Sequence, residues 1–232
     1  KPPVTIKVVG VGGGGGNAVT HMIAAGIKNV SYITVNTDSQ ALYKTPADIK
    51  IQLGENGQGA GANPNVARAY AESARPQLME ALQGADMVFI TAGLGKGTGT
   101  GASAVVAQVA KELGALTVSV VTKPFTSEGP MRAKIADAAA DELGLHSDSL
   151  ITVLNSKLEA LNPDGLMKEW YQAADDVLKS AVSTIVEIIQ SNGYQNVDFR
   201  DVVSVMGSNR GRALMGTARA SGKDRAKTAA LA

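Results

Sequence analysis

Two glycine-rich segments are the strongest candidates for binding a ligand. Gly12–Gly16 is an unbroken run of five glycines followed by Asn17, and Gly93–Gly101 alternates glycine with other residues. Each follows an apolar run typical of a strand and precedes a helical pattern. Glycine lets the backbone approach a ligand closely, and the free N–H groups at a helix N-terminus bind anions. We therefore expect the two loops to wrap one phosphate chain.

The first segment also satisfies the dinucleotide pattern G-x-G-x-x-G through Gly10, Gly12 and Gly15, a match that is weak by itself. A tight strand-to-helix turn is the structural alternative, although a turn does not need five glycines. The sequence contains no Gly-x-x-x-x-Gly-Lys-Ser/Thr motif, and Lys96 stands at the wrong spacing for one. P-loop NTPases are therefore excluded.

Further polar or glycine-rich stations follow the other apolar runs. They are Asn36–Asp38, Gly59–Pro64, Pro124–Gly129 with Arg132, and Asn155. Because the carboxyl ends of parallel strands meet at one edge of a sheet, all these stations should converge there.

The elements that position these stations predict an α/β fold, with a Rossmann-like parallel sheet covered by helices on both faces. Strands are expected at Thr5–Val9, Val30–Val35, Asp86–Thr91, Leu116–Val121 and Ser149–Leu154. Helices are expected at Asn17–Ala25, Pro64–Gln83, Ala102–Leu113 and Met131–Leu143.

The alternation of short apolar runs and helical patterns ends after Leu154. A helical pattern from Gly165 to Gln190 is longer than a normal crossover helix and suggests a central spine. We expect a nucleotide-binding domain over residues 1–164 and the central helix over 165–193. Residues 194–232 have room for a helix, a strand and the start of another helix.

Composition excludes several kinds of site. The chain of 232 residues has no cysteine and only two histidines, His21 and His146, so thiolate, iron–sulfur and histidine metal sites are excluded. No apolar run is long enough to cross a bilayer, and we expect a cytoplasmic protein without direct membrane insertion. The net charge is +1, but residues 200–232 carry +5. Because no aromatic residue interleaves these basic residues, a partner-facing surface is favoured over nucleic-acid binding.

The stations together resemble the tubulin/FtsZ GTPase family. The matching strings run in order along essentially the whole chain: Gly12–Asn17 (GGGGGN), Asn36–Asp38 (NTD), Gly59–Pro64 (GAGANP), Gly97–Gly101 (GTGTG), Pro124–Gly129 and Asn196–Asp201 (NVDFRD). Each string is modest alone, but the combination is specific. Lys96 is a departure, because the family usually has glycine there.

The resemblance implies GTP and GDP as ligands and assigns their contacts. The phosphate loops would be Gly13, Gly14, Gly15, Gly16, Asn17, Gly97, Thr98 and Gly99. Glu128 and Arg132 would contact the sugar, Tyr171 would stack on the base, and Asn155 and Asp175 would read guanine. A carboxylate accepts hydrogen bonds from guanine N1–H and its 2-amino group, which adenine cannot supply. The adjacent Asp176 is the alternative to Asp175.

The resemblance also implies that residues 194–232 contain a catalytic loop and the beginning of a second, C-terminal domain, and that hydrolysis is completed in trans. Asn196, Asp198 and Asp201 would enter the nucleotide pocket of the next subunit, where the aspartates position the attacking water and Asn196 contacts the phosphates. Mg²⁺ would be held through the phosphates, with no protein metal ligands assigned. From the residues alone, two aspartates three apart indicate a helix N-cap, and both roles are compatible.

The implied function is a GTP-hydrolysing cytoskeletal protein that polymerises head-to-tail and scaffolds the bacterial division ring at mid-cell. Other division proteins and membrane tethers are implied partners, although the tail that binds them in the family is absent from this sequence. One alternative is a division-related paralogue that binds GTP with little hydrolysis, motivated by Lys96 and the arginine-rich end. Another is an NAD-dependent Rossmann oxidoreductase, with Asp38 as the ribose acid.

Overall fold

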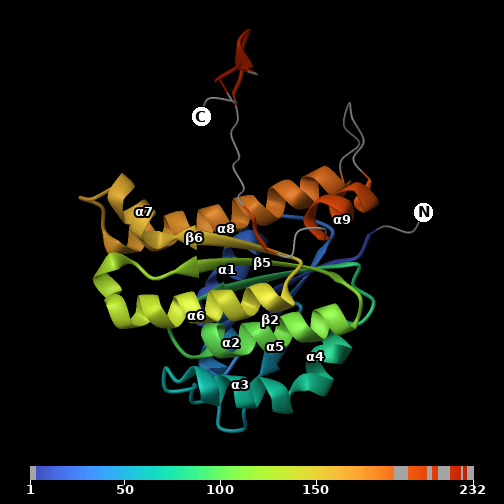
Figure 1. The fold of residues 1–232 in the computed structure, drawn as a ribbon, viewed down its shortest axis with the longest axis vertical. Coiled ribbons are helices and arrows are strands. Elements are labelled where there is room, and N and C mark those ends of the chain that lie inside the picture. Colours follow the sequence, from blue (N-terminus) through green and yellow to red (C-terminus); the bar gives the residue numbers. More distant parts are fainter. Residues whose placement is uncertain (1–3, 191–197, 208–210, 214–219, 226, 229–232) are drawn as a thin grey trace.

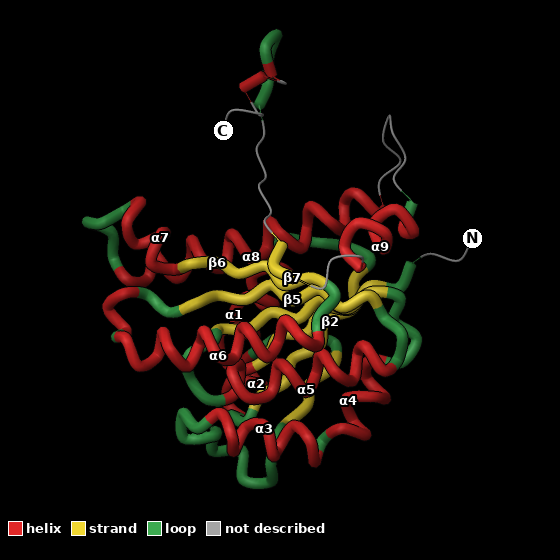
Figure 2. Tube along the Cα trace, viewed as in Figure 1, coloured by secondary structure: helices red, strands yellow, loops and turns green. Residues whose placement is uncertain are grey.

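A computed structural model describes residues 4–190, 198–207, 211–213, 220–225 and 227–228. Within these residues, seven parallel strands form one sheet in the order β3-β2-β1-β4-β5-β6-β7, the central layer in Figures 1 and 2. The strands are β1 (Ile6–Val11), β2 (Val30–Asn36), β3 (Ile49–Gln52), β4 (Met87–Gly93), β5 (Leu116–Lys123), β6 (Ser149–Leu154) and β7 (Gly211–Ala213).

Helices connect successive strands. They are α1 (Gly12–Ala24), α2 (Ser39–Lys44), α3 (Pro64–Ser73), α4 (Arg75–Leu82), α5 (Thr98–Glu112), α6 (Pro130–His146), α7 (Asn155–Leu161), α8 (Met167–Gln190) and α9 (Phe199–Gly207), with a 3₁₀ turn η1 (Thr126–Glu128). None of the helices in the described ranges combines the length and apolarity needed to span a membrane.

Both faces of the sheet are covered by apolar packing, which confirms the predicted fold class. One buried cluster joins the sheet to α4, α5 and α6, and the other joins it to α1, α8 and α9. Neighbouring residues of β1 show the alternation, because Val8 belongs to the second cluster and Val9 to the first. Strands buried on both sides explain the unbroken apolar runs of the sequence.

The chain order of the strands reverses between β1 and β4. From β1 the chain moves outward to β2 and β3, then returns to place β4 on the other side of β1, where Val11 is opposite Ala92. Open α/β sheets bind ligands at the carboxyl end of such a switch point. The two glycine-rich loops follow these two strands.

The structure differs from the expected elements in several places. Short β3, α2 and α7 were not predicted, and the helix expected over Pro64–Gln83 is two helices that meet at Ala74. Pro76, in the first turn of α4, has no backbone N–H to continue the hydrogen-bond ladder of α3. Helix α1 begins at Gly12 rather than Asn17, so the glycines form its first turn.

The stretch after α8 extends the first sheet. β7 pairs in parallel with β6, and Val202 of α9 is buried in the cluster on the α8 face. The Ser149 hydroxyl at the start of β6 donates a hydrogen bond to the carbonyl of Met206, 2.9 Å away. Helix α9 therefore packs at the amino end of the strands. The single strand expected within residues 194–232 corresponds to β7, which ends at Ala213, and the residues directly after it lie outside the described ones.

Gly15 is where α1 lies closest to the sheet. A Cβ atom at Gly15 would be 2.3 Å from the carbonyl oxygen of Thr91 and 2.9 Å from the carbonyl carbon of Gly10. Both are backbone atoms within the sheet and cannot move aside independently. A Cβ at Gly13 would meet nothing within 4 Å. Intrachain packing therefore requires a glycine at position 15 and places no such demand on position 13.

We therefore expect Gly15→Ala to destabilise the chain by about 3 kcal/mol, through overpacking between α1 and β4. For a chain of this size, thermal denaturation should show a Tm lower by about 6–12 °C. Gly13→Ala is the matched control and should leave the Tm within about 2 °C of the unmodified chain. Equal Tm values for the two variants would contradict this packing.

Candidate nucleotide-binding site

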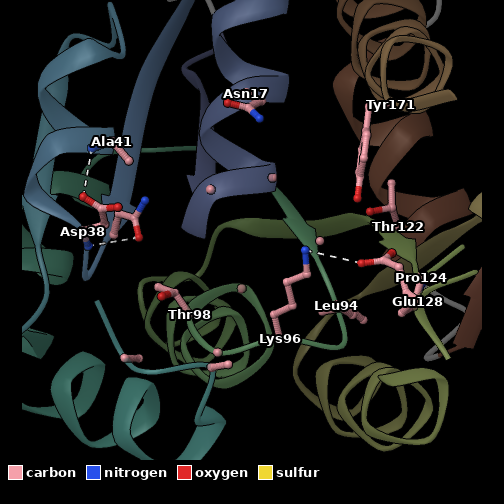
Figure 3. Close-up of a pocket in the computed structure, with 18 of the residues that line it drawn as sticks. Asn17, Asp38, Ala41, Leu94, Lys96, Thr98, Thr122, Pro124, Glu128 and Tyr171 are labelled. Atoms are coloured by element: carbon pink, nitrogen blue, oxygen red, sulfur yellow. Dashed lines mark hydrogen bonds and ion pairs between the residues drawn. The ribbon is translucent and has the colours of Figure 1, made fainter. Parts of the chain in front are cut away.

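A cavity of about 590 Å³ opens at the carboxyl edge of the sheet. Its volume is in the range of sites for small molecules and cofactors. Its wall comes from the ends of β2, β4 and β5, from the first turns of α1 and α5, from the loops after β4 and before α3, from Asn155 directly after β6, and from α8 (Figure 3). The stations that the sequence analysis expected to converge therefore surround one space.

Two helix N-termini border this cavity. Helix α1 begins directly after β1, and α5 begins at Thr98 after the loop that follows β4. A Cβ at Gly12, whose φ is +72°, would be 2.7 Å from the Gly99 nitrogen, so the two glycine segments touch backbone to backbone. The Thr37 and Thr98 hydroxyls lie 2.7 Å apart and join a third loop to them. The first turns of both helices therefore offer N–H groups to one anion.

Gly13 is the open part of this cradle. Gly13 and Gly14 both line the cavity, but a Cβ at Gly14 would be 3.3 Å from the Gly93 nitrogen, whereas one at Gly13 would meet no atom of the described residues within 4 Å. Because no neighbouring atom of the described residues explains the missing side chain at Gly13, this glycine leaves room for a ligand.

Helix α8 forms the opposite wall. Tyr171, Ala174, Asp175 and Leu178 all line the cavity, a spacing that places them on one face of the helix. Tyr171 is 40% exposed and packs edge-on against Phe125, with ring centroids 5.0 Å apart. The tyrosine ring is therefore held in place by the loop after β5 while one side remains free.

Asp175 and Asp176 have different surroundings. Asp175 lines the cavity, and burial raises its pKa to about 6, with a further increase from the Asp176 charge and an opposing effect of His21. Asp176 instead accepts hydrogen bonds from Lys179, at 2.5 Å, and from His21, at 2.9 Å, which lower its pKa. Of the two carboxylates considered from the sequence, only Asp175 lines the cavity.

Asn155 is the most buried polar side chain of the predicted base-binding group. It is 4% exposed, lines the cavity directly after β6, and its Oδ1 has no hydrogen-bond partner among the described residues. A buried amide oxygen without a partner is costly, and a ligand donor in the cavity would satisfy it.

Glu128 lies on the cavity wall between two cations. Its Oε1 is 2.9 Å from Arg132 Nη1 and 3.4 Å from Lys96 Nζ, while its Oε2 accepts a hydrogen bond from the Phe125 N–H at 3.1 Å. The glutamate side chain is only 13% exposed. These contacts fix the carboxylate at the rim of the site.

The structure brings ten of the predicted site residues to the cavity wall. They are Gly13, Gly14, Asn17, Gly97, Thr98, Gly99, Glu128, Asn155, Tyr171 and Asp175. Gly15, Gly16 and Arg132 are not on the wall: Gly15 packs against the sheet, Gly16 borders a neighbouring cavity, and Arg132 reaches the site only through Glu128.

The predicted catalytic loop lies elsewhere. Asp198 accepts a hydrogen bond from the Asp201 N–H at 3.0 Å, and Asp201 accepts one from the Asp198 N–H at 3.2 Å. This reciprocal pair caps α9, which confirms the N-cap reading. The cavity is at the carboxyl edge of the sheet and α9 packs at the amino edge, so neither aspartate lines the cavity of its own chain. Asn196 lies outside the described residues.

Some cavity residues were missed. Thr122, Lys123, Ala174 and Leu178 line the wall but were not predicted as site residues. The helical spacing of Ala174 and Leu178 relative to Tyr171 is a signal that could have found two of them. The described part of the chain has no cluster of three or more histidine, aspartate or glutamate side chains suited to a metal ion.

Comparison with known proteins identifies the family. The model of the Tubulin/FtsZ family, GTPase domain, matches residues 5–163. The chain belongs to the tubulin/FtsZ family. Residues 5–163 include both glycine-rich loops and Asn155, so the matched region carries most of the cavity wall.

Curated relatives are similar over almost the whole chain. The cell division protein FtsZ of Buchnera aphidicola subsp. Schizaphis graminum is 53% identical over 229 residues, covering 97% of this chain and 59% of the relative. The FtsZ of Coxiella burnetii is 51% identical over 231 residues, covering 98% of this chain and 60% of the relative. The chain thus spans about three fifths of the length of these relatives.

Solved structures share the fold. An FtsZ from M. jannaschii, described as an empty dimer, has a TM-score of 0.93 and 42% identity, covering 98% of this chain and 67% of the other. CetZ2 from Haloferax volcanii, described as a GTPγS-bound protofilament, has a TM-score of 0.77 and 23% identity, covering 88% and 64%. At 23% identity, the similarity to CetZ2 concerns the fold alone.

The raised pKa of Asp175 leads to a prediction for the nucleotide-free chain. Because its folded pKa of about 6 exceeds the ordinary value of 3.8, the folded state binds the proton more tightly than the unfolded state. The free energy of unfolding therefore falls as pH rises between these values, and the ionised carboxylate is destabilising at pH 7.5. Asp175→Asn should raise the free energy of unfolding at pH 7.5 by about 1 kcal/mol, a figure that allows for the partial solvent exposure of the carboxylate. For a chain of this size, the Tm should then rise by about 2–4 °C.

The gain in Tm should shrink as the pH is lowered toward 4. Asp176→Asn is the matched control. Its carboxylate is stabilised by Lys179 and His21 but is 54% exposed. Its loss should lower the free energy of unfolding at pH 7.5 by less than about 1 kcal/mol and therefore lower the Tm. A Tm for Asp175→Asn that is unchanged or lower at pH 7.5 would contradict the burial argument.

Proposed function

We propose that the chain binds guanine nucleotides in the cavity at the carboxyl edge and hydrolyses GTP. One observation carries the proposal: two helix N-termini, built from touching glycine loops, face a single cavity whose far wall holds Asp175 and Asn155. Phosphates are bound by the N–H groups at one end, and a base with both donors and acceptors is bound at the other.

The base end suits guanine better than adenine. The Asp175 carboxylate accepts hydrogen bonds from guanine N1–H and the 2-amino group, which adenine lacks in that arrangement. The two guanine donors also favour the ionised form of the Asp175 carboxylate. Asn155 Oδ1, which is buried without a partner among the described residues, accepts a further hydrogen bond from the nucleotide. Tyr171 covers the base with its free face.

Mg²⁺ accompanies the nucleotide in this proposal and neutralises charge that develops on the phosphates. The donor set fits that role: Mg²⁺ usually takes phosphate oxygens, waters and at most one or two carboxylates rather than a protein cage. Asp38 is a carboxylate on the cavity wall, and its Oδ1 already accepts hydrogen bonds from the N–H groups of Gln40 and Ala41.

Hydrolysis is completed by a second copy of the chain. The cavity and the capped aspartates lie at opposite edges of the sheet, so head-to-tail stacking places Asp198 and Asp201 of one copy over the nucleotide of the next. An aspartate there orients and deprotonates the attacking water. The M. jannaschii relative, described as a dimer, supports self-association.

We further propose that the whole protein assembles into protofilaments and scaffolds division at mid-cell, with membrane tethers and other division proteins as partners. The names of the relatives support this assignment. A paralogue that binds GTP with little hydrolysis is the second candidate, favoured by the cation Lys96 on the cavity wall.

Nucleotide specificity tests the base end. The unmodified chain should bind GTP and GDP but not ATP or NAD, as measured by displacement of a fluorescent guanine nucleotide. Asp175→Asn exchanges an acceptor for a donor, so GTP affinity should fall about 10–100-fold at pH 7.5. The same variant should gain affinity for XTP, whose 2-oxo group accepts a hydrogen bond. A uniform loss for GTP and XTP alike would contradict the assigned role of Asp175.

Hydrolysis in trans gives a separate prediction. Asp201→Asn keeps an oxygen that can accept the Asp198 N–H and preserve the cap of α9, but removes the charge. Its GTP affinity should be unchanged, while steady-state phosphate release should fall at least about 100-fold.

Mixing two defective variants provides the control. Asp201→Asn keeps an intact pocket and Asp175→Asn keeps an intact catalytic loop, so a mixture can form complete sites between copies. The GTP turnover of the mixture should exceed the sum of the separate rates and rise with total protein concentration. Turnover equal to that sum, or independent of concentration, would rule out a site shared between copies.

A further inference from the structure

Lys96 occupies a rigidly held position on the cavity wall. A Cβ at Gly95, whose φ is +104°, would be 2.7 Å from the Pro124 ring, and one at Gly97 would be 3.1 Å from the Ala62 backbone. The loop is thus in close contact with other segments on both sides of Lys96. Its side chain extends into the space between the loops in Figure 3, with the ammonium directed toward Glu128.

The ion pair between Lys96 and Glu128 is weak, so Lys96 can leave Glu128 at little cost in free energy. Lys96 Nζ is 3.4 Å from Glu128 Oε1, and the lysine side chain is 56% exposed. Exposed pairs of this kind contribute about 0–1 kcal/mol. The same oxygen of Glu128 is 2.9 Å from Arg132 Nη1, which would continue to balance the carboxylate after Lys96 left. The three side chains together carry a net charge of +1.

No other charged side chain on the described part of this wall is a cation that can leave its partner as Lys96 can. Of the described residues that line the cavity, the carboxylates and amines are Asp38, Lys96, Lys123, Glu128 and Asp175. Lys123 is ion-paired with Asp137, whose partners in the described part of the chain do not include a second cation. Moving Lys123 would leave a carboxylate uncompensated, whereas moving Lys96 would not.

We propose that Lys96 is a phosphate-binding residue, which leaves Glu128 and pairs with the phosphate chain of the bound nucleotide. A charge-assisted contact between an ammonium and a phosphate is stronger than the exposed pair it replaces. The contribution grows with the number of phosphate charges, so Lys96 favours GTP over GDP and GDP over GMP. This inference rests on the proposed guanine-nucleotide site.

The alternative role is that Lys96 only positions Glu128 at the sugar. The two roles make different predictions for a phosphate series. A positioning lysine affects GMP, GDP and GTP equally, because all three carry the same sugar. A phosphate-binding lysine affects them in order of charge.

The experiment measures dissociation constants of the full 232-residue chain for GMP, GDP and GTP, by displacement of a fluorescent guanine nucleotide. A chelator is present to remove competing Mg²⁺. Lys96→Met should weaken GTP binding about tenfold, GDP binding less, and GMP binding by less than about twofold. Lys96→Arg should retain most of the GTP affinity. Lys134→Met, a matched loss of one exposed lysine on α6 outside the cavity, should leave all three affinities unchanged.

The outcomes separate this inference from the proposed function. An equal loss for all three nucleotides, or no loss, would overturn the role of Lys96 while leaving the guanine-nucleotide site intact. If the unmodified chain bound none of the three, the proposed function would fail and this inference with it. Circular dichroism and Tm of Lys96→Met, an exposed loop variant, should match those of the unmodified chain and exclude misfolding as the cause.

Discussion

The close approach of two backbone segments at the switch point of the sheet is the constraint on which the site depends. Gly12 lies against Gly99, and Gly15 lies against the Thr91 carbonyl, at distances that leave no space for a Cβ atom. Because β1 and β4 are adjacent and parallel, the helices that follow them begin side by side. Only glycine lets both first turns come this close. The result is a pair of N-termini directed at one cavity, and the run Gly12–Gly16 itself carries no positively charged side chain.

The far wall of the cavity shows the usual conflict between stability and function. Asp175 is a partly buried carboxylate whose raised pKa reflects an unfavourable environment for its charge, and the Asn155 oxygen is buried with no hydrogen-bond partner in the part of the chain that the structure describes. Both groups lower the stability of the empty chain, and both become satisfied when a base with suitable donors occupies the cavity. Selectivity for a guanine base would then arise from groups that the chain alone leaves unpaired. On the same helix, Asp176 is already satisfied by Lys179 and His21.

Helix α8 links the two edges of the sheet. Its first turns carry Tyr171 and Asp175 into the cavity, and its later residues Val182 and Val186 are buried in the cluster that also contains Val202 of α9. One continuous helix therefore connects the cavity with the end of the molecule where Asp198 and Asp201 cap α9. The proposed head-to-tail assembly uses both ends of this helix, with the cavity meeting one neighbour and the capped aspartates the other.

The sequence by itself determined the fold class, the two glycine loops and the edge at which the stations meet, because apolar runs and glycine clusters are local signals that follow from strand burial and backbone freedom. It also determined that Asp198 and Asp201 could cap a helix. Only the tertiary structure showed that Asp175 and not Asp176 lines the cavity, since both occupy adjacent positions of one helix and differ only in what packs against them. It likewise decided that Gly15 serves packing while Gly13 faces open space, and that Lys96 meets Glu128. Short β3, α2 and α7 were missed because elements of four to seven residues carry too little periodicity to be recognised, and their contacts with the rest of the fold stabilise them.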